Sequence, residues 1–137
     1  MENRFIAVKA SPTIIVGECP GRQRQRNANN QVFHGNRTGD FIEALIEGKS
    51  NIILTNANNF PASQSTAQGA FELLSLILKY QPKKVILLGR KARLALDLVI
   101  DPTMRFFETK CFDHPSYRLR FNRNVEEYRQ ELLKELE

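Results

Sequence analysis

Cysteine is scarce in this chain, and long apolar runs are absent from it. The two cysteines, Cys19 and Cys111, are too few for a disulfide scaffold or for a metal site built from four thiolates. No apolar run approaches the ~20 residues that a membrane-spanning helix requires, and the opening segment MENRFIAVKASP lacks the apolar stretch of a signal peptide. The sequence therefore predicts a cytoplasmic protein with reduced thiols, no cofactor, no metal and no membrane partner.

Positive charge exceeds negative charge. Twenty Lys and Arg residues against fifteen Asp and Glu residues give a net charge of +5 and a pI of about 9.5. This balance favours a polyanionic partner such as nucleic acid, although a merely basic surface would give the same totals. The arginines concentrate in two segments, one with Arg22, Arg24 and Arg26 and the other with Arg118, Arg120 and Arg123.

The length and composition fit one hydrophobic core. A chain of 137 residues is the size of an ordinary domain, and its 42% hydrophobic and 26% charged content is typical of globular proteins. The sequence contains neither a repeat nor a linker. We therefore expect a single domain over residues 1–137, acting as a monomer.

Short apolar runs predict strands at residues 13–16, 52–54 and 85–88, and residues 105–109 are expected to form a fourth strand. Segments with helical spacing of apolar residues alternate with these runs. Such alternation is typical of a parallel sheet covered by helices on both faces. The predicted fold class is α/β, a three-layer αβα arrangement with a four-stranded parallel sheet.

The first predicted helix begins at Thr38 and ends at Gly48. The second begins at Ser65 and ends near Tyr80. The third follows the strand at 85–88 and stops before Asp101. The residues expected on their buried faces are Phe41, Ile42, Leu45 and Ile46 in the first, Phe71, Leu74 and Leu78 in the second, and Ala92, Leu96 and Val99 in the third.

The last predicted helix begins near Asn124, where Glu127 completes a pattern like a capping box. Its apolar stripe consists of Val125, Tyr128, Leu132 and Leu136.

Three of the segments that follow the strands carry unusual residues. Residues 17–21 read Gly-Glu-Cys-Pro-Gly, residues 55–59 are rich in Asn, and residues 114–118 read His-Pro-Ser-Tyr-Arg. Taken singly, each has an ordinary explanation as a turn, a solvated loop or a surface histidine. In parallel α/β folds, however, ligands bind beyond the carboxyl ends of the strands, which is where all three segments lie.

The order and strand context of these motifs resemble the uracil-DNA glycosylase superfamily, especially its thermophile-type family. That family's first motif reads Gly-Glu-Ala-Pro-Gly and its last reads His-Pro-Ser. Residues 32–39 are similar to its Pro-Phe-Val-Gly-Arg-Ala-Gly segment with one residue inserted, residues 54–56 to its strand ending in a base-reading Asn, and residues 85–92 to its third strand and Gly-x-x-Ala turn. The resemblance extends over roughly residues 14–123. The four cysteines that hold an iron-sulfur cluster in that family have no counterpart here.

The resemblance implies roles for individual residues. Glu18 would position or activate the attacking water and favour the positively charged sugar, while His114 would donate to the base oxygen as negative charge develops there. Asn56 would hydrogen-bond the edge of a flipped base, Phe33 would stack on its face, and Gly17 and Cys19 would border the same pocket. Cys19 has no catalytic part in this scheme.

The resemblance and the basic segments together predict the contacts with DNA. Ser116 and Arg118 suit phosphates beside the flipped nucleotide, and either Leu119 or Arg118 would wedge into the gap that the base leaves. The remaining residues expected at the DNA interface are Arg120, Arg22 and Arg37.

The function that these residues favour is a monofunctional DNA glycosylase. It would hydrolyse the N-glycosidic bond of uracil or a related modified or damaged pyrimidine and leave an abasic site. The alternative is a catalytically silent module of the same fold that binds a base, a nucleotide or single-stranded DNA, because a fold does not fix a function.

Overall fold

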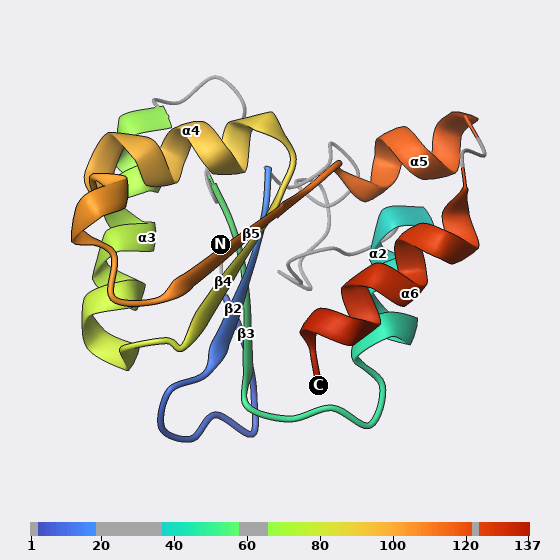
Figure 1. Cartoon of the computed structure of the whole chain (residues 1–137), viewed down its shortest axis with the longest axis horizontal. Helices are drawn as coiled ribbons and strands as arrows, with labels where there is room; N and C mark the ends of the chain where they lie inside the picture. The colour runs from blue at the N-terminus through green and yellow to red at the C-terminus, as the bar shows by residue number, and fades with distance from the viewer. Residues whose placement is uncertain (1–2, 19–36, 58–65, 122–123) are drawn as a thin grey trace.

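A sheet with strand order β1-β3-β2-β4-β5 forms the centre of the molecule (Figure 1). The computed structural model describes residues 3–18, 37–57, 66–121 and 124–137. In these residues the strands are β1 (Arg4–Ile6), β2 (Thr13–Gly17), β3 (Ile52–Asn56), β4 (Lys84–Leu88) and β5 (Glu108–Phe112). β2 pairs in parallel with both β3 and β4, and β5 pairs in parallel with β4, whereas β1 lies antiparallel to β3.

Helices cover both faces of the sheet, so the predicted three-layer α/β class is confirmed. In Figure 1, α3 (Thr66–Tyr80) and α4 (Arg90–Val99) lie on one side, and α2 (Arg37–Ile46), α5 (Pro115–Phe121) and α6 (Val125–Glu135) lie on the other. A short 3₁₀ turn, η1 (Pro102–Met104), leads from α4 toward β5. The four predicted strands form the parallel part of the sheet.

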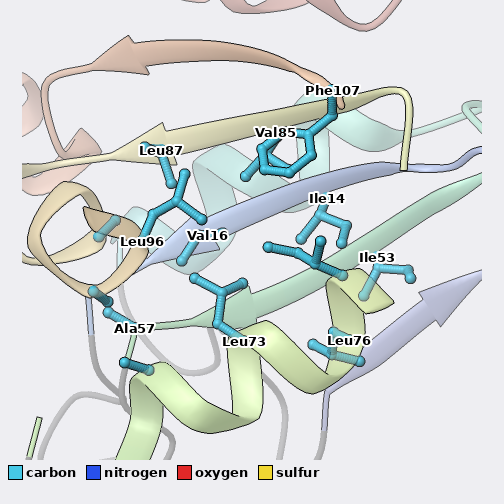
Figure 2. Close-up of a cluster of buried hydrophobic side chains, with 14 residues drawn as sticks. Ile14, Val16, Ile53, Ala57, Leu73, Leu76, Val85, Leu87, Leu96 and Phe107 are labelled. Atoms are coloured by element: carbon cyan, nitrogen blue, oxygen red, sulfur yellow. The ribbon is translucent and has the colours of Figure 1, made fainter. Parts of the chain in front are cut away.

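Each strand alternates its side chains between two cores, because successive residues of a strand point to opposite faces. On β2, Ile14 and Val16 pack toward α3 and α4 (Figure 2), whereas Ile15 packs toward α2 and α6. β4 divides in the same way. Strands buried on both faces read as continuous apolar runs, which is why the sequence reveals them.

The fourth strand was predicted three residues too early. Residues 105–109 were expected to form it, whereas β5 begins at Glu108 and pairs Glu108 with Lys84 through to Phe112 with Leu88. Phe107, which precedes the strand, is buried in the core beneath α3 and α4. Phe107 therefore marks an anchoring point before an edge strand whose own residues are exposed or only partly buried.

The buried face predicted for α3 was also wrong. Phe71 and Leu78 are 65% and 57% exposed, while Ala70, Leu73, Leu76 and Ile77 fill the core instead. The helix carries apolar residues around most of its circumference. Helical spacing alone therefore fits more than one face.

The buried faces predicted for the other helices are confirmed. Every expected residue of α2 is buried; in α4 and α6 the expected residues are buried or packed against a core. The capping box at Asn124 is not formed, because this residue has a left-handed backbone (φ 47°) and its side chain makes no cap hydrogen bond. The Ser65 cap lies outside the described residues.

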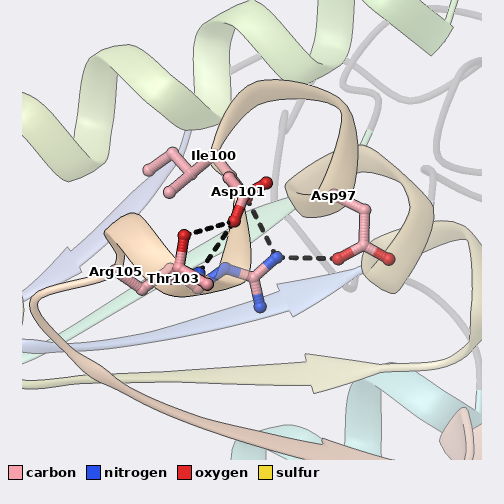
Figure 3. A network of polar contacts seen from close by, with 5 residues as sticks. All are labelled: Asp97, Ile100, Asp101, Thr103 and Arg105. Carbon is pink, nitrogen blue, oxygen red and sulfur yellow. Dashed lines mark hydrogen bonds and ion pairs between the residues drawn. The ribbon is translucent and has the colours of Figure 1, made fainter.

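The turn after α4 is held by a polar network around Arg105 (Figure 3). The Arg105 guanidinium donates to the Asp97 carboxylate at 2.7 Å and to the Ile100 carbonyl at 3.2 Å. Asp101 caps the 3₁₀ turn by accepting from the Thr103 N–H at 2.9 Å. These contacts fix the end of α4 and pair the charge of Asp97.

Candidate active site

The carboxyl ends of the parallel strands gather the predicted residues at one edge of the sheet. Gly17, the last residue of β2, pairs with Asn56, the last residue of β3. β2 and β4 are neighbouring strands, and the helices that follow them, α2 and α4, lie on opposite faces of the sheet (Figure 1). Such a switch point is where α/β proteins open a binding crevice. Glu18 follows β2 directly, and His114 follows β5 after one residue.

Glu18 and His114 meet over Gly89. A Cβ atom added to Gly89 would lie 3.1 Å from Glu18 Oε2 and 3.1 Å from the His114 Cβ. The glycine has φ 103° and ψ 173°, a conformation that is essentially restricted to glycine. Its missing side chain therefore brings a carboxylate and an imidazole side by side. The sequence indicated only a turn at this position.

The Glu18 carboxylate sits at the beginning of α4. Its Oε2 accepts a hydrogen bond from the Lys91 backbone N–H at 3.3 Å. The first N–H groups of a helix have no partner within the helix, and the helix dipole places partial positive charge there. This position orients the carboxylate and stabilises its negative charge.

His114 is held as a neutral imidazole with a defined tautomer. Its Nδ1 accepts from the Ser116 N–H at 3.2 Å and lies 2.8 Å from Ser116 Oγ. Since a backbone N–H can only donate, Nδ1 is the acceptor and the proton of the neutral ring resides on Nε2. Burial lowers the pKa of His114 below its ordinary value, and the negative charge of Glu18 opposes this in part. His114 is therefore a hydrogen-bond donor at neutral pH.

The segment that carries His114 is anchored from α5 and α6. The Tyr128 hydroxyl donates to the backbone carbonyl of Asp113, and Arg118 Nε donates to the Asp113 carboxylate at 2.9 Å. The Arg118 guanidinium lies 5.3 Å from the centre of the Tyr128 ring. The Gly89 N–H donates to the Phe112 carbonyl at 2.8 Å, which ties the end of β5 to the same glycine.

Asn56 ends β3, the strand next to β2, and pairs with Gly17, the residue before Glu18. Its side chain is only 2% exposed, and the next residue, Ala57, donates its N–H to the Gly17 carbonyl at 2.8 Å. The end of β3 is therefore fixed against the end of β2, from which Glu18 projects. The structure brings Glu18, Asn56 and His114 to one edge of the sheet.

The remaining predicted residues fall into two groups. Ser116 lies on α5 against His114, Arg118 is engaged by Asp113, and Leu119 packs against the core beneath α2 and α6. α5 itself was not predicted, because the segment after His114 was interpreted as a loop. Cys19, Arg22 and Phe33 lie outside the described residues, and the side chains of Arg37 and Arg120 are not described.

A cavity of about 660 Å³ opens beside Glu18 and His114. α4 forms one wall, and the end of β5 and the start of α5 form the other. The residues that line it are Glu18, Gly89, Arg90, Arg93, Leu94, Asp97, Cys111, Phe112, Asp113, His114 and Tyr117. Arg90 and Arg93 were missed by sequence reasoning, because only their position beside the Glu18–His114 pair distinguishes them from other surface arginines.

Comparison with protein families places this site in a known context. The model of the uracil DNA glycosylase superfamily matches residues 5–137. The chain belongs to the uracil DNA glycosylase superfamily. The resemblance given by its motifs is thereby confirmed at the level of the superfamily, and the likeness to the thermophile-type family stays a prediction. A search of curated proteins found no match.

Membership of the superfamily supports a glycosylase-like function acting on DNA in base-excision repair. Among the described residues, no three His, Cys, Asp or Glu side chains form a cluster that could hold a metal ion. Over the same residues, no helix is long and apolar enough to cross a membrane.

Proposed function

We propose that this chain hydrolyses the N-glycosidic bond of a uracil, or of a related modified or damaged pyrimidine, flipped out of DNA. The observation that carries the proposal is the meeting of Glu18 and His114 over Gly89, with Asn56 on the adjacent strand end. The reaction breaks the bond from C1′ of the sugar to the base, and water supplies a hydroxyl group to C1′. The products are a free base and an abasic site.

The sugar half of the reaction needs a negative group, because positive charge builds on the sugar as the bond to the base lengthens. Glu18 fills this role as a carboxylate. It also accepts a proton from the attacking water as the new C–O bond forms. The Lys91 N–H holds one carboxylate oxygen, Oε2, and thereby fixes the direction of the other.

The base half of the reaction needs a donor, because the departing base takes the electron pair of the broken bond. His114 offers its Nε2–H, since Ser116 occupies Nδ1. A neutral donor suits this position because a charged imidazolium would require a proton that the buried ring does not readily take up. His114 thus stabilises negative charge on a base carbonyl oxygen.

Recognition of the base is assigned to Asn56, Phe33, Gly17 and Cys19. An amide side chain donates and accepts together, as the edge of a pyrimidine requires, and an aromatic ring stacks on its face. Extrusion of the base from the helix is part of the proposal, because the bond is otherwise out of reach. Ser116, Arg118, Arg120, Arg22 and Arg37 are proposed to contact the DNA backbone, with Leu119 or Arg118 as the wedge.

The direct test uses a labelled oligonucleotide that contains one uracil. Incubation with the protein followed by alkali should cleave the strand at that position, because alkali breaks the chain at an abasic site. Glu18→Gln should abolish the product. Glu131→Gln, which removes an exposed carboxylate of α6, is the matched control and should leave cleavage unchanged.

The substrate base is then defined with a panel of oligonucleotides that carry other pyrimidine lesions. Cleavage of one of these in place of uracil would assign the damaged or modified base. Tight binding across the panel with no cleavage by the intact chain would contradict the glycosylase and favour the silent binding module.

A further inference from the structure

The cavity beside Glu18 and His114 continues along one face of α4. Arg90, Arg93, Leu94 and Asp97 follow the spacing i, i+3, i+4 and i+7, which places them on the same side of the helix. The cavity therefore extends over successive helical turns away from the two reacting groups.

Two of the three acidic side chains that line this cavity, Asp97 and Asp113, are already paired, and the third is the proposed catalytic Glu18. Asp97 accepts from Arg105 at 2.7 Å, and Asp113 accepts from Arg118 at 2.9 Å. Both partner guanidinium groups belong to the protein itself. The carboxylates of Asp97 and Asp113 thus leave little negative charge to repel an anionic ligand.

Arg90 and Arg93 differ from the other arginines whose side chains are described. Arg4, Arg105, Arg118 and Arg129 each form an ion pair with a carboxylate. Arg90 and Arg93 are exposed and form no ion pair with a described residue, yet both line the cavity. The positive charge that remains in this cavity is concentrated on α4.

We infer that Arg90 and Arg93 hold two backbone phosphates of the nucleic-acid strand that carries the target base. The inference rests on the proposed function and adds the path of the strand. A polymer suits the arrangement because it can present a base to Glu18 and His114 and phosphates to the next helical turn together. Guanidinium groups are well suited to phosphate oxygens. Tyr117, which is 44% exposed on the opposite wall, is placed to stack on a neighbouring base.

This path differs from the one that the sequence alone favours. Arg118 was expected to contact phosphate, but its guanidinium is engaged by the Asp113 carboxylate and lies over the Tyr128 ring. For the proposed contact of Arg118 with DNA, its guanidinium would have to be shared between Asp113 and the DNA. Arg90 and Arg93 can bind phosphate without breaking an ion pair with a described residue.

The test measures how DNA binding depends on salt. Each phosphate contact contributes about 0.7 to the slope of log affinity against log salt for a single strand and about 0.9 for a duplex. The double variant Arg90→Gln/Arg93→Gln should therefore lower the slope by about 1.4 or about 1.8 respectively. Its affinity at low salt should fall by about tenfold or more. Both proteins carry Glu18→Gln, so that a uracil-containing oligonucleotide stays intact during the titration.

Two further variants make the result specific. Lys79→Gln/Lys83→Gln removes the same charge from exposed positions at the opposite edge of the sheet and should keep the original slope. Arg90→Lys/Arg93→Lys keeps the positive charge and should retain most of the original salt slope. An unchanged slope in the glutamine variant, or an equal loss in the Lys79/Lys83 control, would overturn the inference.

Failure of this inference is separable from failure of the proposed function. If the intact chain cleaves a uracil-containing strand and the glutamine variant keeps full slope and affinity, the strand path is wrong and the glycosylase stands. If no base is released but the slope falls as expected, the α4 contacts stand and the glycosylase is wrong.

Discussion

Tyr128 of α6 donates its hydroxyl hydrogen bond to the backbone carbonyl of Asp113, the residue immediately before His114. The Tyr128 side chain is 2% exposed and packs between Phe41 and Phe112. Burial raises its pKa, so the hydroxyl keeps its proton and remains a donor. A core residue of the last helix thus fixes the backbone that carries the proposed base-side donor.

Tyr128→Phe should lower the free energy of unfolding by about 1–2 kcal/mol, because it leaves a carbonyl without its donor and keeps the ring packing. It should also reduce kcat more than it raises KM, since the Asp113–His114 segment is loosened. Urea denaturation and steady-state kinetics measure the two effects. Tyr80→Phe is the control, because no hydrogen bond from the Tyr80 hydroxyl is found among the described residues. Equal losses in both variants would argue against a specific role for Tyr128.

Gly89→Ala should reduce kcat by about a hundredfold, because the new methyl group presses on Glu18 and His114 and displaces both. Gly48→Ala is a matched control, since Gly48 also has a positive φ (75°) but has nothing within 4 Å of an added Cβ. Backbone strain should lower stability by about 1–2 kcal/mol in Gly48→Ala and by about 1–3 kcal/mol in Gly89→Ala. Only Gly89→Ala should lose activity at a temperature where both proteins are folded, and full activity in Gly89→Ala would contradict the site geometry.

The pH dependence of kcat/KM should show an acid limb below the ordinary imidazole pKa of 6.5. Burial lowers the pKa of His114, so the neutral donor persists to lower pH than in a free histidine. Protonation of the unfolded chain also begins near that ordinary value, so the His114 contribution to stability should decline as pH falls through it. His114→Gln should flatten this decline in denaturation experiments. An acid limb of kcat/KM centred at or above pH 6.5 would contradict a neutral His114 ring.

Ser116→Ala should lower kcat/KM by about fivefold, which corresponds to about 1 kcal/mol for one hydrogen bond. The effect is modest because the backbone N–H of residue 116 still donates to Nδ1 of His114 and keeps the tautomer. Nitrogen NMR of the imidazole should therefore show the Nε2–H form in both proteins. A change of tautomer in the variant would assign the orientation of the ring to the hydroxyl alone.

The site was predictable to the extent that strand ends are visible in sequence. Residues such as Ile14 and Ile86 are buried between two helical layers, so their strands read as unbroken apolar runs. The positions of Glu18 and Asn56 then follow, because parallel strands end at one edge. The position of His114 after the last strand was predicted even though that strand begins three residues later than expected, because the His-Pro-Ser motif itself identifies the segment.

Other features depend on contacts that no local pattern encodes. β1 has three residues, and its strand character comes from pairing with β3 rather than from its own composition. α3 buries the face that carries Ala70 and Leu73 and leaves the larger Phe71 exposed, although its spacing fits either face. Gly89 gains its importance only when Glu18 and His114, distant in sequence, converge on it.

That convergence has a consequence for how the protein becomes active. The Glu18 carboxylate and the Lys91 N–H that orients it are 73 positions apart, and the Asp113 backbone is fixed by a residue of a still later helix. Contacts between distant positions form slowly, because the intervening chain must first be ordered. During translation, the acidic residue leaves the ribosome long before its partners exist. Catalytic competence should therefore arise at the close of folding, after the sheet is complete and α6 has docked.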